Sequence, residues 1–234
     1  MLNFIYINSI AMKRFFTFAI LTTINIIAIS AQNEYCIAKI DNNSNIIVCN
    51  NMIDAFSAED IINVKQFSIT NHSNIFVNEK KYDINIGCIN DWDNYDGGMF
   101  NVISVSKDNN TLLEIKQPDC WTFTYGGKSE TDFHKYTNNQ YYIPIEISNN
   151  LSILIFVGWP YGGELPLLTI LALTDSDVKL VFNKHMAIIS ITKDATNFAM
   201  EVISSIVEHD ANNNAINQSH THRIYSVGND IFYK

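Results

Sequence analysis

Residues 91–98 hold the side chains of this chain that could most readily do chemistry. The segment places two aromatic rings and a diglycine among three carboxylates, those of Asp91, Asp93 and Asp96. Several carboxylate oxygens on a tightly turning loop are what a hard cation such as Ca²⁺ requires. The spacing differs from that of an EF-hand, because Tyr95 stands at the fifth position and Val102 at the twelfth, where a bidentate glutamate belongs. We therefore expect a solvated acidic turn and no cofactor, with calcium as the alternative.

Aromatic residues in and beyond this loop indicate a binding role. Aromatic faces next to hydrogen-bonding acids suit sugar rings and protein hot spots. Residues 159–163 combine a tryptophan and a tyrosine with a proline and two glycines, which oppose regular strand structure and favour exposure. The predicted ligand-binding residues are Trp92, Trp159, Tyr161, Asp91, Asp93 and Asp96.

Motifs for catalysis are missing from the sequence. It has neither a Gly-x-Ser-x-Gly elbow nor a glycine-rich phosphate loop. A glycosidase needs two carboxylates roughly 5 to 9 Å apart, and an acidic chain offers many such pairs without singling one out. We expect no enzyme. A polysaccharide-directed hydrolase that uses the carboxylates of residues 91–96 is the alternative, and a purely structural domain is the third interpretation.

A pair of histidines is the other arrangement with a chemical interpretation. His220 and His222 are two residues apart, which places both imidazoles on one face of a strand. Two such rings can share a metal ion with a third ligand. No third ligand is identifiable in the sequence, so we expect a histidine pair on a sheet surface and no metal.

The N-terminal region has the pattern of an export signal. Met12 begins a short basic stretch, which is followed by an apolar run over 15–29 and by two small residues. The run is shorter than the roughly 20 residues of a membrane span, which favours a secretory signal peptide. We expect residues 1–31 to be an N-terminal extension plus signal peptide, with Met12 as the start. Residues 32–234 then form a β-rich, secreted or periplasmic domain without a transmembrane segment.

The charge of the mature chain restricts its partners. Cleavage after residue 31 removes two of the 15 basic residues and none of the 24 acidic residues, which leaves a net charge of −11. Nucleic acids and anionic membrane surfaces bind through clustered lysine and arginine. We therefore expect no nucleic acid, and a protein or a glycan as the partner.

Four cysteines remain after cleavage, at Cys36, Cys49, Cys88 and Cys120. An even number in an exported chain favours two disulfides over free thiols. Residues 41–44 favour a turn, and pairing Ile40 with Asn45 across it places Cys36 opposite Cys49. That register predicts a bridge between these two cysteines and leaves Cys88 for Cys120. Reduced, buried cysteines are the alternative.

Short β-branched and aromatic runs, separated by Asn, Asp and Gly clusters, make up most of the chain. Predicted strands cover 37–40, 45–48, 100–106, 111–116, 121–125, 141–147, 152–158, 167–173, 178–183, 187–192, 198–203, 222–227 and 230–233. Such short, evenly spaced strands predict an all-β fold of antiparallel sheets, as a sandwich or a small propeller-like arrangement. An N-cap-like Ser57 opens the one predicted helix, over 57–65.

Differences between the predicted strands suggest their places in the fold. Residues 151–157 and 167–173 are apolar nearly throughout, so both of their faces should be covered, as in the central strands of stacked sheets. Residues 178–182 are more mixed, which indicates an edge or a half-exposed face. A division into two lobes is expected near 117–140.

Four segments in about the last hundred residues resemble parts of uncharacterised secreted bacterial proteins. They are 141–145 (YYIPI), 156–163 (FVGWPYGG), 165–170 (LPLLTI) and 178–184 (VKLVFNK). Their rhythm is also similar to that of propeller blades, although the repeated Asp-rich loop of calcium-binding propellers is missing. The resemblance implies a β-rich exported domain and no activity. The sequence as a whole predicts an exported, disulfide-bonded β domain that binds a protein or glycan partner without catalysis, at the cell envelope or outside the cell.

Overall fold

Strands and turns account for the described part of the chain. The computed structural model describes residues 33–54, 67–89, 100–122, 141–158, 165–195, 197–209 and 215–234, of which 118–120, 206–209 and 215–217 are described by their backbone alone. These ranges hold no helix, and therefore none that is long and apolar enough to cross a membrane. The predicted helix over 57–65 lies outside the described residues.

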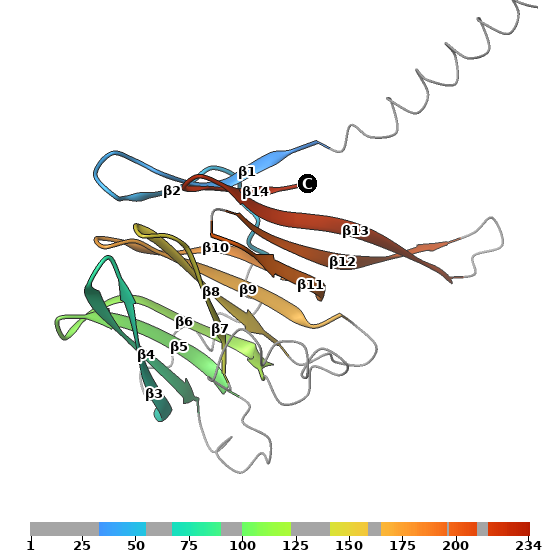
Figure 1. Ribbon diagram of the computed structural model, residues 1–234. Coiled ribbons are helices and arrows are strands. Elements are labelled where there is room, and N and C mark those ends of the chain that lie inside the picture. The colour runs from blue at the N-terminus through green and yellow to red at the C-terminus, as the bar shows by residue number, and fades with distance from the viewer. Residues whose placement is uncertain are drawn as a thin grey trace, which may run out of the picture. The chain divides into compact units, whose positions relative to one another are not determined.

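Three antiparallel sheets contain the strands (Figure 1). Sheet A has the order β11 (Ala187–Lys193), β12 (Phe198–His209), β13 (Ala215–Val227), β14 (Asp230–Tyr233), β1 (Tyr35–Ile40) and β2 (Ile46–Val48). Sheet B has the order β10 (Val178–His185), β9 (Leu167–Leu173), β8 (Leu151–Val157) and β7 (Ile143–Ser148). Sheet C has the order β3 (Ser68–Val77), β4 (Lys80–Cys88), β5 (Phe100–Lys107) and β6 (Asn110–Trp121). The predicted all-β, antiparallel fold class is confirmed.

Tight turns between these strands use residues that tolerate a left-handed backbone. Asn78 and Glu79, with φ of 46° and 65°, close the β3–β4 hairpin, and Asp108 and Asn109, with φ of 52° and 64°, close β5–β6. Positive φ at both central residues defines a type I′ turn, whose twist matches that of the strands it joins. Gly228, with φ of 59°, begins the predicted turn between β13 and β14.

Sheet B lies between the other two sheets, so that both of its faces are buried (Figure 1). Along β8, Ile153 and Ile155 point into the cluster shared with sheet A, whereas Leu154 and Phe156 point into the cluster shared with sheet C. Every residue of β8 and of β9 is buried. The expectation that 151–157 and 167–173 are covered on both faces is confirmed, as is an edge position for the strand that begins at Val178.

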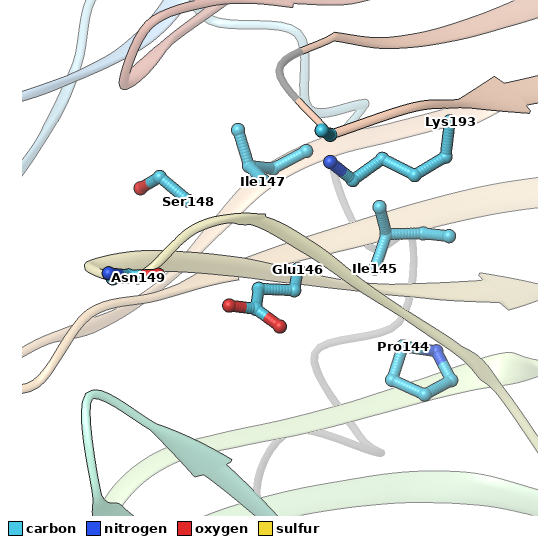
Figure 2. Close-up of a pocket in the computed structure, with 8 residues that line it drawn as sticks. Pro144, Ile145, Glu146, Ile147, Ser148, Asn149 and Lys193 are labelled. Atoms are coloured by element: carbon cyan, nitrogen blue, oxygen red, sulfur yellow. The ribbon is translucent and has the colours of Figure 1, made fainter.

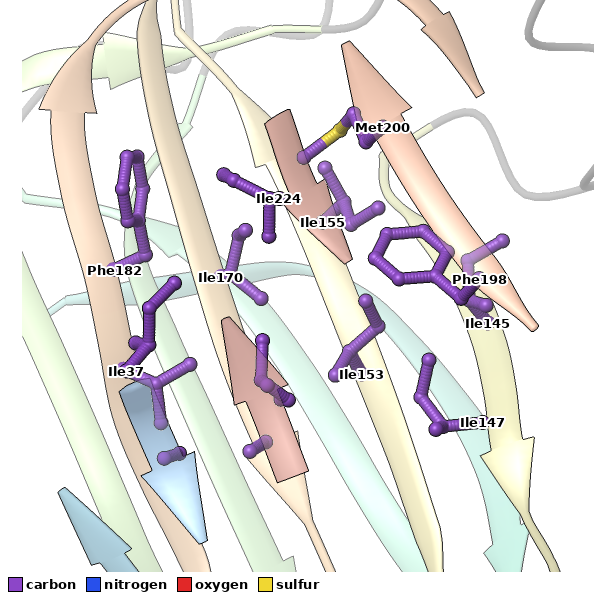
Figure 3. Packing of buried hydrophobic residues seen from close by; sticks show 14 of the residues in the cluster. Ile37, Ile145, Ile147, Ile153, Ile155, Ile170, Phe182, Phe198, Met200 and Ile224 are labelled. Carbon is purple, nitrogen blue, oxygen red and sulfur yellow. The ribbon is translucent and has the colours of Figure 1, made fainter. Parts of the chain in front are cut away.

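The A–B core, the cluster between sheets A and B, is mainly aliphatic. Figure 3 shows Ile153, Ile155 and Ile170 of sheet B interleaved with side chains of sheet A such as Met200 and Ile224. All five are fully buried. Branched aliphatic side chains fill the space between two twisted sheets without polar atoms that would need partners.

The B–C core, the cluster between sheets B and C, is rich in aromatic rings. The ring of Phe156 lies 6.2 Å from that of Phe100, 6.4 Å from that of Trp121 and 5.3 Å from that of Tyr142, measured between centroids. Their tilted and edge-on arrangements are those that aromatic quadrupoles favour. Trp121 is therefore a buried residue of the B–C core.

Each polar group on a buried ring of the B–C core has a hydrogen-bond partner. The Trp121 indole N–H donates to Thr169 Oγ1 at 2.8 Å, and the hydroxyl of Tyr82 donates to the Thr174 carbonyl at 2.6 Å. The hydroxyl of Tyr142 shares a hydrogen bond of 2.7 Å with Ser73 Oγ. These directional bonds fix the orientation of the buried rings.

The β1–β2 hairpin forms as expected, but its predicted register is wrong by one residue. Ile40 pairs with Ile46 and not with Asn45. The cause is the Asp41 carboxylate, which accepts the backbone N–H groups of Asn43 and Asn45 at 2.8 Å each. This Asx-type bonding keeps Asn45 in the turn and lengthens the loop by one residue.

Strands β3 and β4 have no counterpart in the sequence-based prediction. Several predicted strands are also too short, since β12 begins at the expected residue but extends to His209, and β13 begins at Ala215. Residues 123–140, which include most of the region where a division into lobes is expected, lie outside the described residues.

Candidate functional site

The predicted binding loops lie outside the described residues. The structure leaves out 90–99 and 159–164, and with them Asp91, Trp92, Asp93, Asp96, Trp159 and Tyr161. Their role as a ligand site stays a prediction, as does calcium as an alternative ligand of the 91–98 segment.

The histidine pair on β13 is integrated into the fold. His220 and His222 lie on the same face of the strand as the buried Ile224. His222 Nε2 is 2.8 Å from Ser204 Oγ, and its ring stacks on Tyr233 with centroids 5.1 Å apart. Burial, and next the charge of His220, lowers the pKa of His222. Within the described ranges, no three His, Cys, Asp or Glu side chains are grouped to hold a metal ion.

Cys36 and Cys49 approach each other without forming a bond. Their sulfur atoms are 3.2 Å apart, compared with about 2.05 Å in a disulfide. The register of the hairpin puts Cys36 across from Asn50, whose side-chain amide donates to the Cys36 carbonyl, and leaves Cys49 one position away. Burial, and next the hydrogen bond with Cys49, raises the pKa of the Cys36 thiol to about 12. Cys88 is buried in the B–C core, and the Cys120 side chain lies outside the described set, so the second bridge stays a prediction.

A groove of about 460 Å³ runs along β7, the edge strand of sheet B. Its volume falls in the range of about 300–1,000 Å³ that is typical of ligand sites. Figure 2 shows the Lys193 side chain near Ile145 and Ile147, with Glu146 and Pro144 on the other side of the strand. The lining is completed by Ser148, the last residue of β7, by Asn149 of the β7–β8 turn and by Ala195 of the β11–β12 turn.

Hydrogen bonds at the end of β8 reveal which way its backbone groups point. The N–H of Gly158 donates to the Leu167 carbonyl, so even-numbered residues of this run face β9. The carbonyl of Val157 accepts the N–H of Thr122, so the backbone groups of odd-numbered residues point away from β9. Over most of β8, the strand on that side is β7. Antiparallel strands alternate their hydrogen-bonding direction in this way at every residue.

The same alternation settles the direction of the β7 backbone. Ile143 and Ile145 pair with odd-numbered residues of β8 and therefore bond inward. Pro144 and Glu146 turn their backbone groups outward, into the groove. A proline is tolerated at such a position because the N–H that it lacks would have faced away from the sheet. The groove thus presents the Pro144 carbonyl and both the N–H and the carbonyl of Glu146.

Side-chain hydrogen bonds hold both rims of the groove. Asp194 closes the β11–β12 turn by accepting the Asn197 N–H at 2.8 Å, which fixes the backbone next to Lys193. On the other rim, Ser148 Oγ donates to Asn229 Oδ1 at 2.7 Å and ties the β7–β8 turn to sheet A. These hydrogen bonds hold both rims of the groove in place, as a preformed binding site requires.

The groove can bind charged or hydrogen-bonding groups. The Glu146 carboxylate is exposed and forms no hydrogen bond or ion pair within the described residues, whereas the Lys193 ammonium donates to the Asp194 carbonyl at 2.5 Å. The described lining of the groove contains a single carboxylate, that of Glu146. The lining residues therefore do not form the pair of carboxylates that glycoside hydrolysis needs. Sequence reasoning missed the groove because its two rims are separated by about fifty residues. The proline inside a strand pattern was the one available signal of an edge.

Comparisons with models of protein families, with curated proteins and with solved structures found no match for this chain. The sequence, the stacked sheets and the groove along β7 are the features of this chain that bear on its function. These define an all-β protein with a polar, charged groove at the edge of its central sheet.

Proposed function

We propose that this chain is an exported, non-catalytic β domain that binds a protein or glycan partner in the groove along β7, at the cell envelope or outside the cell. One observation carries the proposal: within the described part of the chain, the outward backbone groups of the edge strand β7 have no partner, and they lie with a carboxylate and an ammonium in a groove of about 460 Å³. The outward backbone groups of an edge strand can bond to a partner, so an accessible groove beside one favours a binding role.

Export is supported by the sequence of residues 12–31 and by the cysteine geometry. Cys36 and Cys49 need to approach by only about 1 Å to reach the length of a disulfide bond. We propose that they form a disulfide in an oxidising compartment, where a bridge across a hairpin of this length stabilises the fold by about 3 kcal/mol.

A thermal-shift screen of residues 32–234 tests the binding role. Glycan fragments and envelope proteins are added to the folded protein, because a ligand that binds only the folded state raises its Tm. We expect a Tm increase with at least one ligand, and a smaller increase for Glu146→Gln and Lys193→Met. Glu201→Gln and Lys80→Met, which remove the same charges outside the groove, are the matched controls and should respond like the wild type.

Two outcomes would contradict the proposal. A ligand shift that is equally large in the groove variants and in the controls would place the site elsewhere, as would a shift lost only on Trp159→Ala or Asp93→Ala. Steady cleavage of a glycan by the wild-type protein would replace binding with the hydrolase alternative.

A further inference from the structure

Resting on the proposed function, we infer that the partner is a protein, which contributes an extended peptide segment that adds to β7 as a short extra strand. The segment places an acidic side chain beside Lys193 and a basic side chain, from the neighbouring residue, beside Glu146. The proposal therefore names a β-strand partner with two consecutive, oppositely charged residues.

The backbone of β7 favours a peptide over a glycan. The groups that face the groove are the Pro144 carbonyl and the N–H and carbonyl of Glu146, spaced as in a sheet ladder. An extended peptide presents N–H and carbonyl groups with the same repeat and can bond to all three. A sugar chain has no such repeat, and no aromatic ring for stacking lines the described part of the groove.

The two charges lie on opposite sides of β7, which requires the partner's two charges to be on consecutive residues. Ile145 and Ile147 point toward sheet A, where Lys193 lies, whereas Glu146 points to the other side of the strand. Successive residues of an added strand point alternately to these two sides. One residue of the peptide therefore meets the ammonium and the next meets the carboxylate.

The added strand must be short. Pro144 offers no donor, and a bulge between Glu146 and Ser148 interrupts the regular edge of β7. Both features also prevent unlimited pairing between copies of sheet B, since proline, charge and bulges are the usual ways of blunting an edge. They leave room for a few residues of a partner rather than for another sheet.

Capped peptides of alternating threonine and valine test this inference. One has a central glutamate–lysine step, a second has two glutamines there, and a third has two glutamates. We expect the wild-type protein to bind the first about two- to fivefold more tightly than the second, as for exposed ion pairs. In Glu146→Lys, whose groove carries two cations, the preference should move to the third peptide. The Tm of the free variant checks that it is folded.

A backbone control separates strand addition from attraction between charges. N-methylation of the peptide amide that faces β7 should abolish binding, while N-methylation of the next amide should leave it intact. Equal effects of the two methyl groups, or no change of charge preference in Glu146→Lys, would overturn the inference.

Amide NMR spectra of the protein, recorded with peptides and with glycan fragments, distinguish failure of this inference from failure of the proposed function. If glycan fragments but no peptide shift the signals of Glu146 and Lys193, the groove is a binding site and the peptide inference is wrong. If neither class of ligand shifts these signals, both proposals fail.

Discussion

Sheet B buries one face against sheet A and the other against sheet C, and the side chains at the two interfaces differ in kind. The A–B core is filled by isoleucines and other aliphatic groups, with Phe182 and Phe198 as its buried rings. The B–C core contains five buried aromatic residues, and the polar groups of its buried Trp and Tyr side chains are all hydrogen-bonded. Non-directional apolar packing thus holds sheet B against sheet A, whereas directional hydrogen bonds add to the packing between sheets B and C.

This difference has an energetic meaning. Burial of aliphatic surface contributes about 25 cal/mol per Å² regardless of direction, so the A–B core should tolerate exchange of one aliphatic residue for another. A hydrogen bond in the B–C core leaves a buried partner unsatisfied when it is lost, at about 1–3 kcal/mol. We therefore expect sheet C to fix the orientation of sheet B, and sheet A to contribute mainly burial.

The largest effect is expected from Trp121→Phe. The substitution leaves a cavity and removes the donor to Thr169, so the free energy of unfolding should fall by about 2–4 kcal/mol. Urea unfolding of the mature protein measures it. Phe182→Leu, in the A–B core, is the control and should cost about 1–2 kcal/mol. Equal losses would mean that the two cores do not differ as described.

Tyr82→Phe isolates one hydrogen bond of the B–C core. Burial, followed by the Asp175 carboxylate, raises the pKa of Tyr82 to about 12, so its hydroxyl stays a donor to the Thr174 carbonyl at ordinary pH. We expect a loss of about 1–3 kcal/mol in urea unfolding, because the carbonyl is left buried and unpaired. Tyr233→Phe, which removes a hydroxyl at the margin of the A–B core, should change stability much less.

Ile155→Val tests whether aliphatic positions are equivalent in the two cores. Deleting one buried methylene should cost about 0.5–1.5 kcal/mol in the A–B core, and Ile84→Val should cost the same in the B–C core. Matching unfolding curves would place the difference between the cores in their aromatic and polar groups. A much larger loss for Ile84→Val would place it in packing instead.

The smallest expected effect is a dependence of stability on pH at the margin of the A–B core. The pKa of His222 is lowered in the folded state, so its contribution to stability is present above the ordinary value of about 6.5. It is lost as the pH falls from there through the lower folded pKa, because the unfolded chain binds the proton more readily. Thermal unfolding measured at a series of pH values should show Tm decreasing as the pH falls below about 6.5, and this decrease should be smaller in His222→Gln. An unchanged pH dependence in that variant would contradict this.

Much of the fold could be predicted from local patterns. The continuous apolar runs of β8 and β9 indicate strands covered on both faces, and the Gly228 turn and the β5–β6 hairpin follow from their turn residues. Strands β3 and β4 were harder to predict, because β3 is largely polar and its turn at Asn78 and Glu79 contains no glycine. The hydrophobic alternation of 82–88 was the available signal there.

The parts that could not be predicted depend on contacts between distant residues. The register of β1 and β2 is decided by side-chain bonds within the Asp41 turn, which strand pairing alone does not reveal. The groove depends on Lys193 of sheet A and Glu146 of sheet B lining the same edge strand, and no local pattern links them. Pro144 marks the edge but not what lies beside it.

Hydrogen exchange at the Glu146 amide, with and without a ligand that raises the Tm, is the most direct test of the groove as the binding site. The N–H of Glu146 points into the groove, whereas that of Ile145 bonds to β8, so the neighbouring residue is an internal control. We expect the ligand to slow exchange at Glu146 and to leave Ile145 nearly unchanged. A bound ligand that slows exchange elsewhere and leaves Glu146 unaffected would contradict the assignment of β7 as the site.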